Sequence, residues 1–205
     1  MNPKRIPLFP LDVVLFPGCS LPLHIFEPRY KMMIRRCLNM KMRFGVILAQ
    51  KAGIATVGCT AAIVSLAKQY PNGEMDILTR GEKAFQVKEV FDDKPYLEAA
   101  IECFDEPPES YAPAPSKLTE TYDQCYWLLF NRAPQKPRAK VRISPAYAMA
   151  SSLPLPLEQK QLLLENRDEA ARQMQLLEQL NEWLPQLAYL NERRQVARGN
   201  GHSLN

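Results

Sequence analysis

Residues 7–30 read PLFPLDVVLFPGCSLPLHIFEPRY, and the rest of the chain is organised around this stretch. Its residues 13–16 form a short β-prone apolar run. The run stops at Pro17-Gly18, a dipeptide suited to the centre of a type II turn because glycine tolerates a positive φ. Apolar residues then alternate with others over residues 21–25, which predicts a second strand. Pro22 cannot donate a hydrogen bond to a neighbouring strand, so we expect this strand at an edge or a bulge.

The periodicity then changes from that of a strand to that of a helix. Pro28 suits the first helical position, and apolar residues follow at the spacing of a helix with one buried face. These residues are Tyr30, Met33, Ile34, Cys37 and Leu38. The opposite face is expected in water and carries Arg29, Lys31, Arg35 and Arg36. Glu27 and Arg29 are charged side chains beside apolar sequence, and we predict a structural role for them, such as capping the helix, rather than a ligand contact.

The following sixty residues continue in short β-prone runs. A run at 43–49 is followed by a longer one at 53–70 that contains Gly58, where we expect a bulge or kink. Asn72-Gly73 is a strong hairpin signal. The returning strand is expected to end at Gly81, and two more strands are expected at 85–91 and 96–104. About six short strands with one early helix are typical of a closed or nearly closed small β-barrel.

The composition changes at residue 105. Residues 105–117 are acidic and proline-rich, which is typical of a linker. The chain beyond has helical periodicity, with Ser144-Pro145 and Asp168 as expected helix starts and Pro185 as an expected kink in the last helix. We therefore predict an α+β protein with four parts: a β-barrel over 5–104, a linker over 105–117, a helical bundle over 118–197 and a disordered tail over 198–205.

Charge and cysteine content limit the class of protein. The net charge of +4 is too small to indicate nucleic-acid binding by itself. Five cysteines are scattered and never occur at C-x-x-C spacing, which favours free thiols in a reducing compartment, and we expect a cytoplasmic location. No apolar run approaches the roughly 18 residues of a membrane-spanning helix, so we expect no membrane association.

A search for catalytic chemistry finds none. There is no phosphate-binding glycine loop and no serine in a nucleophile elbow, and two histidines are too few for a histidine-based metal site. His24 is expected to be a hydrogen-bonded or partly exposed ring on an edge strand. Cys37, Cys59, Cys103 and Cys125 are expected to pack as small buried hydrophobes, and Cys19 is the only thiol that merits a reactivity test. We expect no enzyme activity, cofactor or metal.

One basic segment keeps an alternative open. Four cations occur within seven residues: Lys136, Arg138, Lys140 and Arg142. They could contact nucleic acid, but the segment lacks the interleaved aromatic residues of a single-strand platform. A solvated loop near the acidic linker is the simpler interpretation.

The opening stretch resembles the start of the Lon protease N-terminal, substrate-binding domain family. The motifs in the family's order and spacing are Leu8-Phe9-Pro10-Leu11, Leu15-Phe16-Pro17-Gly18, Leu21-Pro22-Leu23 and Ile25-Phe26-Glu27-Pro28-Arg29-Tyr30. One departure is Ala84, where the family commonly has arginine, so an anion contact at that position is not expected here. The signature residues that are candidates for polypeptide binding or for a structural role are Phe9, Pro10, Phe16, Pro17, Phe26, Glu27, Arg29 and Tyr30.

The resemblance implies a PUA-like pseudo-barrel followed by a helical bundle, in a stand-alone bacterial-type member without ATPase and protease domains. It implies a non-catalytic module that binds unfolded polypeptides or exposed apolar segments in a groove between barrel and bundle, with a protease or a chaperone as a further partner. An exposed barrel edge is compatible with a homodimer. The alternatives are an RNA-binding barrel that uses the basic segment and, more remotely, a small-ligand pocket in the barrel or at its junction with the bundle.

Overall fold

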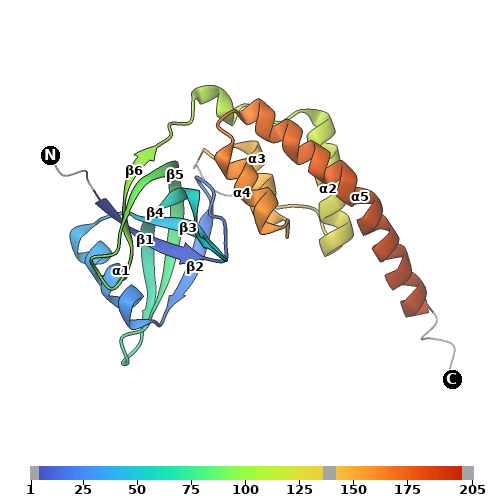
Figure 1. Cartoon of the computed structure of the whole chain (residues 1–205). Coiled ribbons are helices and arrows are strands. Elements are labelled where there is room, and N and C mark those ends of the chain that lie inside the picture. The colour runs from blue at the N-terminus through green and yellow to red at the C-terminus, as the bar shows by residue number, and fades with distance from the viewer. Residues whose placement is uncertain (1–4, 136–141, 200–205) are drawn as a thin grey trace, which may run out of the picture.

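The computed structural model describes residues 5–135 and 142–199, the last six of these as backbone only. The chain folds into an N-terminal β-barrel and a group of C-terminal helices that pack against one side of it (Figure 1). The barrel contains β1 (Arg5–Leu11), β2 (Ser20–Ile25), α1 (Pro28–Met40), β3 (Phe44–Gln50), β4 (Gly53–Gln69), β5 (Met75–Phe91) and β6 (Glu98–Cys103). The helical part contains the 3₁₀ helix η1 (Pro108–Tyr111), α2 (Ser116–Phe130), α3 (Pro145–Ser152), α4 (Leu157–Glu165) and α5 (Glu169–Gly199).

Strand pairing closes the sheet, which confirms the predicted α+β fold with a barrel. The strand order is β2-β5-β4-β3-β1-β6, and β5 also pairs with β6. The strands β5, β4, β3, β1 and β6 therefore form a ring, and β2 pairs with β5 outside it. The long β4–β5 hairpin extends beyond the ring, where β4 past Ala61 has β5 on one side and no described strand on the other. Two register shifts interrupt this outer part of the hairpin.

The predicted turn is present, but the predicted first strand is not. Gly18 has φ of 80°, and the Cys19 amide donates to the Phe16 carbonyl at 3.1 Å, as in a type II turn. Residues 13–16, predicted as a strand, are irregular, and the first strand is β1. Prolines are tolerated inside β1 because its residues 5–7 pair with β6 while residues 8–11 pair with β3. Each half of β1 thus behaves as an edge strand.

Gly81 does not end a strand, contrary to the sequence prediction. It lies within β5, which runs unbroken from residue 75 to residue 91. Its amide donates to the Cys19 carbonyl at 2.9 Å, and its carbonyl accepts from the Gly18 amide at 2.8 Å. A Cβ at Gly81 would lie 2.3 Å from the Phe16 carbonyl oxygen, so the absent side chain allows the turn to lie directly against β5.

Helix α1 lies on the side of the barrel away from the other helices (Figure 1). Its predicted apolar face is buried except for Leu38, which is half-buried. Arg36 lies on the predicted water-facing side and is 33% exposed, and its Nη1 atom donates to Glu98 Oε1 at 2.6 Å. The Glu98 side chain is only 3% exposed. Burial alone would raise the pKa of Glu98, but hydrogen bonds from Lys94 and Arg36 outweigh it and lower this pKa.

The predicted helix starts in the C-terminal part are confirmed. Ser144 Oγ accepts from the Tyr147 amide at 3.4 Å, and Asp168 Oδ1 accepts from the Ala171 amide at 2.8 Å. The segment predicted as a linker contains η1, and α2 begins within it at Ser116. Helix α5 includes residues 198–199, which the composition places in a disordered tail, whereas residues 200–205 lie outside the described part.

Candidate functional site

The barrel and the helices meet at a tightly packed junction. The turn at residues 16–19, part of the signature stretch, packs against α3 and the segment before it. The rings of Phe16 and Tyr147 stack with centroids 4.9 Å apart, and Cys19 Sγ lies 3.9 Å from the Tyr147 carbonyl oxygen. A Cβ at Gly18 would lie 2.6 Å from Ile143 Cγ1, so glycine is needed there for packing as well as for its positive φ.

A buried group of polar side chains, here called the Arg172 cluster, ties the linker to α3 and α5. Its members are Glu106, Ser144, Tyr147, Glu169 and Arg172. Arg172 has no exposed surface and donates to Glu106 Oε2 at 2.6 Å, to Glu169 Oε2 at 2.8 Å and to Tyr147 Oη at 2.8 Å. Burial alone would lower the pKa of Arg172, but hydrogen bonds to the carboxylates raise it, so the guanidinium stays charged.

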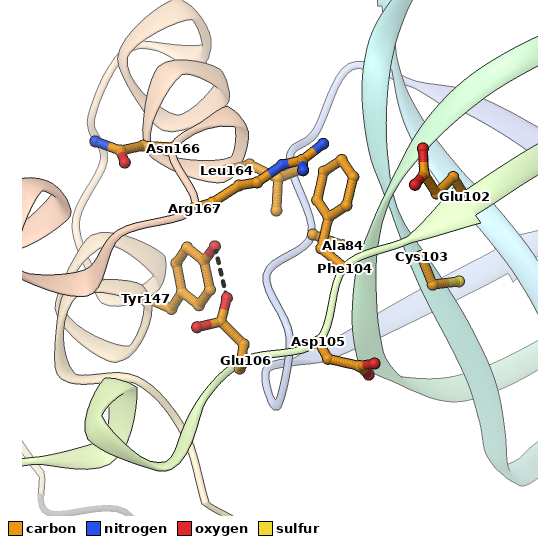
Figure 2. Close-up of a pocket in the computed structure, with 10 residues that line it drawn as sticks. All are labelled: Ala84, Glu102, Cys103, Phe104, Asp105, Glu106, Tyr147, Leu164, Asn166 and Arg167. Carbon is orange, nitrogen blue, oxygen red and sulfur yellow. Dashed lines mark hydrogen bonds between the residues drawn. The ribbon is translucent and has the colours of Figure 1, made fainter.

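Beside this cluster lies a polar hollow of about 210 Å³, here called the linker pocket (Figure 2). Three carboxylates line it, and each already has a cation: Glu102 pairs with Lys88, Asp105 with Lys83 and Glu106 with Arg172. The Arg167 guanidinium lies 3.5 Å from the centre of the Phe104 ring. These paired charges make the linker pocket a poor match for an apolar ligand. We interpret the pocket as a structural contact between the barrel and the helices.

A larger hollow of about 500 Å³, here called the α4 pocket, lies between the β3–β4 turn and α4. The barrel side contributes Leu48, Ala49, Gln50 and Lys51, and α4 contributes Leu157, Glu158, Gln161, Leu162 and Glu165. Leu162 is 53% exposed and lies on the open side of this hollow. Four of these nine residues are apolar, two on each wall, so the α4 pocket combines apolar surface with charged and polar side chains.

Gln161 attaches α4 to the barrel at this pocket. Between the pairs Ile47–Gly58 and Ala49–Ile54, β3 contributes one residue and β4 three, so the ladder is irregular there. Gln161 Nε2 donates to the carbonyl of Val57, one of these three β4 residues, at 3.0 Å, and to Glu165 Oε1 at 2.9 Å. Gln161 Oε1 is buried and has no hydrogen-bond donor among the described residues.

The structure distributes the predicted signature residues over three places. Phe16 and Pro17 lie at the junction. Phe9 and Tyr30 pack in the barrel core with ring centroids 4.2 Å apart, and Pro10 is half-buried on β1. The remaining three lie near the start of α1, where Phe26 is 58% exposed and Glu27 accepts from Arg29 Nε at 2.9 Å. Glu27 occupies the N-cap position, but its side chain makes no capping hydrogen bond.

Of the predicted basic contacts, Lys136, Arg138 and Lys140 lie outside the described residues. Arg142 is exposed, and its guanidinium lies 5.9 Å from the centre of the Tyr111 ring. His24 is exposed on β2, and its Nδ1 lies 2.7 Å from Asp76 Oδ1, which confirms the predicted hydrogen-bonded ring on an edge strand.

The five thiols are unpaired, and most of them are buried. All five cysteines are free, and only Cys103 is exposed, contrary to the prediction that it is buried. Burial raises the pKa of Cys19, and raises that of Cys37 and of Cys125 to about 11, so these thiols stay protonated at neutral pH. Among the described residues, no group of histidine, cysteine or acidic side chains could hold a metal, and no helix has the length and apolar character needed to cross a membrane.

Residues 5–182 match the family described as the ATP-dependent protease La (LON) substrate-binding domain, and the chain belongs to this family. It is 31% identical over 105 residues to the Lon protease of Parabacteroides distasonis, and 25% identical over 196 residues to Lon protease 2 of Myxococcus xanthus. These alignments cover 47% and 87% of this chain, but only 13% and 24% of the relatives.

Solved structures show the same fold. A Lon N-terminal domain protein from Xanthomonas campestris is 27% identical with a TM-score of 0.67, over 89% of this chain and 99% of that chain. The N-terminal domain of the Mycobacterium avium complex Lon protease is 17% identical with a TM-score of 0.58, over 87% and 98% of the two chains, and this likeness concerns the fold alone. The chain is thus a substrate-binding module of the Lon type.

Proposed function

We propose that this protein binds unfolded polypeptides or exposed apolar segments without catalysing a reaction, and that the α4 pocket is the contact site. The observation that carries the proposal is the exposed Leu162, which lies with Leu157 opposite Leu48 and Ala49 across a hollow at the junction. An apolar side chain entering this hollow would remove apolar surface from water on both walls. The family relationship supports a polypeptide as the occupant.

The size of the pocket suggests weak binding. Burial of one or two apolar side chains contributes about 1.5–3 kcal/mol each. Ordering a flexible segment opposes this gain, so we expect dissociation constants between about 10 µM and 1 mM. Weak binding to many sequences is appropriate for a module that samples unfolded chains. We also infer, from the Lon proteases among its relatives, that bound polypeptides are passed to a protease or chaperone partner.

The experiment compares an unfolded protein with the same protein in its folded form. Reduced and carboxymethylated lactalbumin, labelled with a fluorophore, is titrated with the full chain and followed by anisotropy. The proposal expects saturable binding of the unfolded form only. It also expects Leu162→Ser to weaken binding about tenfold or more, because the variant replaces the exposed apolar wall. Equal binding of folded and unfolded forms, or no binding of either, would contradict the proposal.

The other sequence-based hypotheses stay predictions. Nucleic-acid binding rests mainly on Lys136, Arg138 and Lys140, which lie outside the described residues, and no specific observation favours it. Its test is the affinity for single-stranded RNA at rising salt, which should fall steeply if phosphates are bound.

Homodimer formation can be tested by sedimentation. The cytoplasmic location is supported by five free thiols.

A further inference from the structure

The α4 side of the α4 pocket, here called the α4 wall, carries two glutamates that binding of an apolar side chain does not require. Glu158, Leu162 and Glu165 follow one another at i, i+4 and i+7 on one exposed face of α4. Within the described residues, neither glutamate has a cation within 4.0 Å, and Glu165 accepts only from Gln161. By contrast, each carboxylate of the linker pocket has its own cation.

Gln161 adds a further acceptor to this wall. Its amide orientation follows from its partners, since the Val57 carbonyl and the Glu165 carboxylate are both acceptors and must face the NH₂ group. The Oε1 atom is then left without a donor among the described residues. Lys51 is the one cation among the nine described residues that line the pocket. The α4 wall therefore offers acceptors and lacks donors.

We propose that the α4 pocket selects segments in which a lysine or arginine lies two residues from an apolar residue. This inference rests on the proposed function and specifies its substrate class. The apolar side chain would contact Leu162, and the cationic side chains would lie at Glu158 and Glu165. On α4, Leu162 lies about one helical turn from each glutamate, so their Cβ atoms are about 5–6 Å apart. In an extended ligand, residues i and i+2 are separated by a similar distance of roughly 6.6 Å. The favoured pattern is basic-x-apolar-x-basic.

Charge complementarity decides between a basic and an acidic occupant. A lysine or arginine brings three to five N–H donors to a wall that holds two exposed carboxylates, Glu158 and Glu165. An aspartate or glutamate at the same position would face both carboxylates at close range, and Lys51 lies on the opposite wall. The α4 pocket therefore discriminates against acidic segments.

The test uses the full chain and three labelled peptides with a central leucine. Both residues two positions from the leucine are arginine in the first peptide, glutamine in the second and glutamate in the third. Anisotropy titration at low salt should give at least fivefold tighter binding of the arginine peptide than of the glutamine peptide, and weaker binding still of the glutamate peptide. The advantage should shrink at 0.5 M salt because the glutamates are exposed.

Two matched variants locate the effect. The double variant Glu158→Gln/Glu165→Gln should remove most of the arginine advantage and leave the glutamine peptide unaffected. The control Glu178→Gln/Glu182→Gln also removes two exposed glutamates, which lie four residues apart on α5 and away from the pocket, and should keep the advantage. Leu162→Ser should weaken all three peptides, whereas Met174→Ser, which changes a 62% exposed residue on α5, should not.

The outcomes separate this inference from the proposed function. If the peptides bind and Leu162→Ser weakens them, but arginine gives no advantage, the charge selection is wrong and the apolar binding site stands. If the advantage persists in Glu158→Gln/Glu165→Gln, the cations bind elsewhere and the inference fails. If no peptide and no unfolded protein binds, both the inference and the proposed function fail.

Discussion

Replacing Arg172 with methionine should strongly destabilise the junction. The guanidinium has no exposed surface and donates five hydrogen bonds, to Glu106, Glu169, Tyr147 and the Asn166 carbonyl. Methionine has a similar length and helix propensity, so the change removes the charge and the donors while keeping most of the volume. Two carboxylates would then remain in a largely buried site without their cation.

The expected loss follows from the burial of this ion cluster. Removing one partner of a buried ion pair typically costs about 3–5 kcal/mol, because the remaining charge stays desolvated. We expect Arg172→Met to lose this amount in the free energy of unfolding. Neutralising both acids as well, by adding Glu106→Gln and Glu169→Gln, should recover a large part of the loss, because no uncompensated charge is left.

Urea unfolding followed by two signals would test this. The fluorescence of Trp127 and Trp183 reports on the helical part, and far-ultraviolet circular dichroism reports on the whole chain. Arg167→Met is the control, since Arg167 is exposed and its loss should change the stability by less than about 1 kcal/mol. If Arg172→Met destabilises the chain no more than this control does, or if the triple variant is less stable than Arg172→Met alone, the reasoning is refuted.

Three further predictions concern the barrel. Gly81→Ala should lower the free energy of unfolding by about 1–3 kcal/mol, measured by thermal denaturation, because its Cβ would collide with the Phe16 carbonyl. The pKa of Glu98 is lowered in the folded state, so its stabilisation is present above the ordinary value of 4.5 and is lost as pH falls through the folded-state pKa. Glu98→Gln should therefore be less stable than the natural chain at pH 7, and the difference should shrink as the pH is lowered below 4.5. Cys103, the exposed thiol, should react with iodoacetamide before the other four, as mass spectrometry of peptides would show.

Local signals in the sequence predicted the local structure well. Pro17-Gly18 encodes its turn through backbone chemistry alone, and Ser144 and Asp168 mark helix starts through their side-chain oxygens. The β1 strand was harder to recognise because its two prolines argue against a strand inside a sheet. Its tolerance of Pro7 and Pro10 depends on a change of partner halfway along the strand, which only the closed barrel reveals.

The candidate site depends on tertiary contacts that sequence patterns do not contain. In the sequence, Arg172 is indistinguishable from the solvent-exposed charges of an amphipathic helix. Its burial becomes clear only from its contact with Glu106, 66 residues earlier in the chain. The same holds for Gln161, whose partner carbonyl at Val57 lies 104 residues away. The exposure of Leu162 has one weak indication in the sequence, because this leucine lies between two glutamates on α4.

Among the described residues, two borders of the sheet have no neighbouring strand: the outer side of β2 and the outer part of β4. An unprotected strand border is a template on which other polypeptides can stack without limit. Here Pro22 is exposed on β2 and withholds an amide donor, while register shifts and Lys68 disturb the outer part of β4. These features oppose the addition of a foreign polypeptide backbone to either border of the sheet.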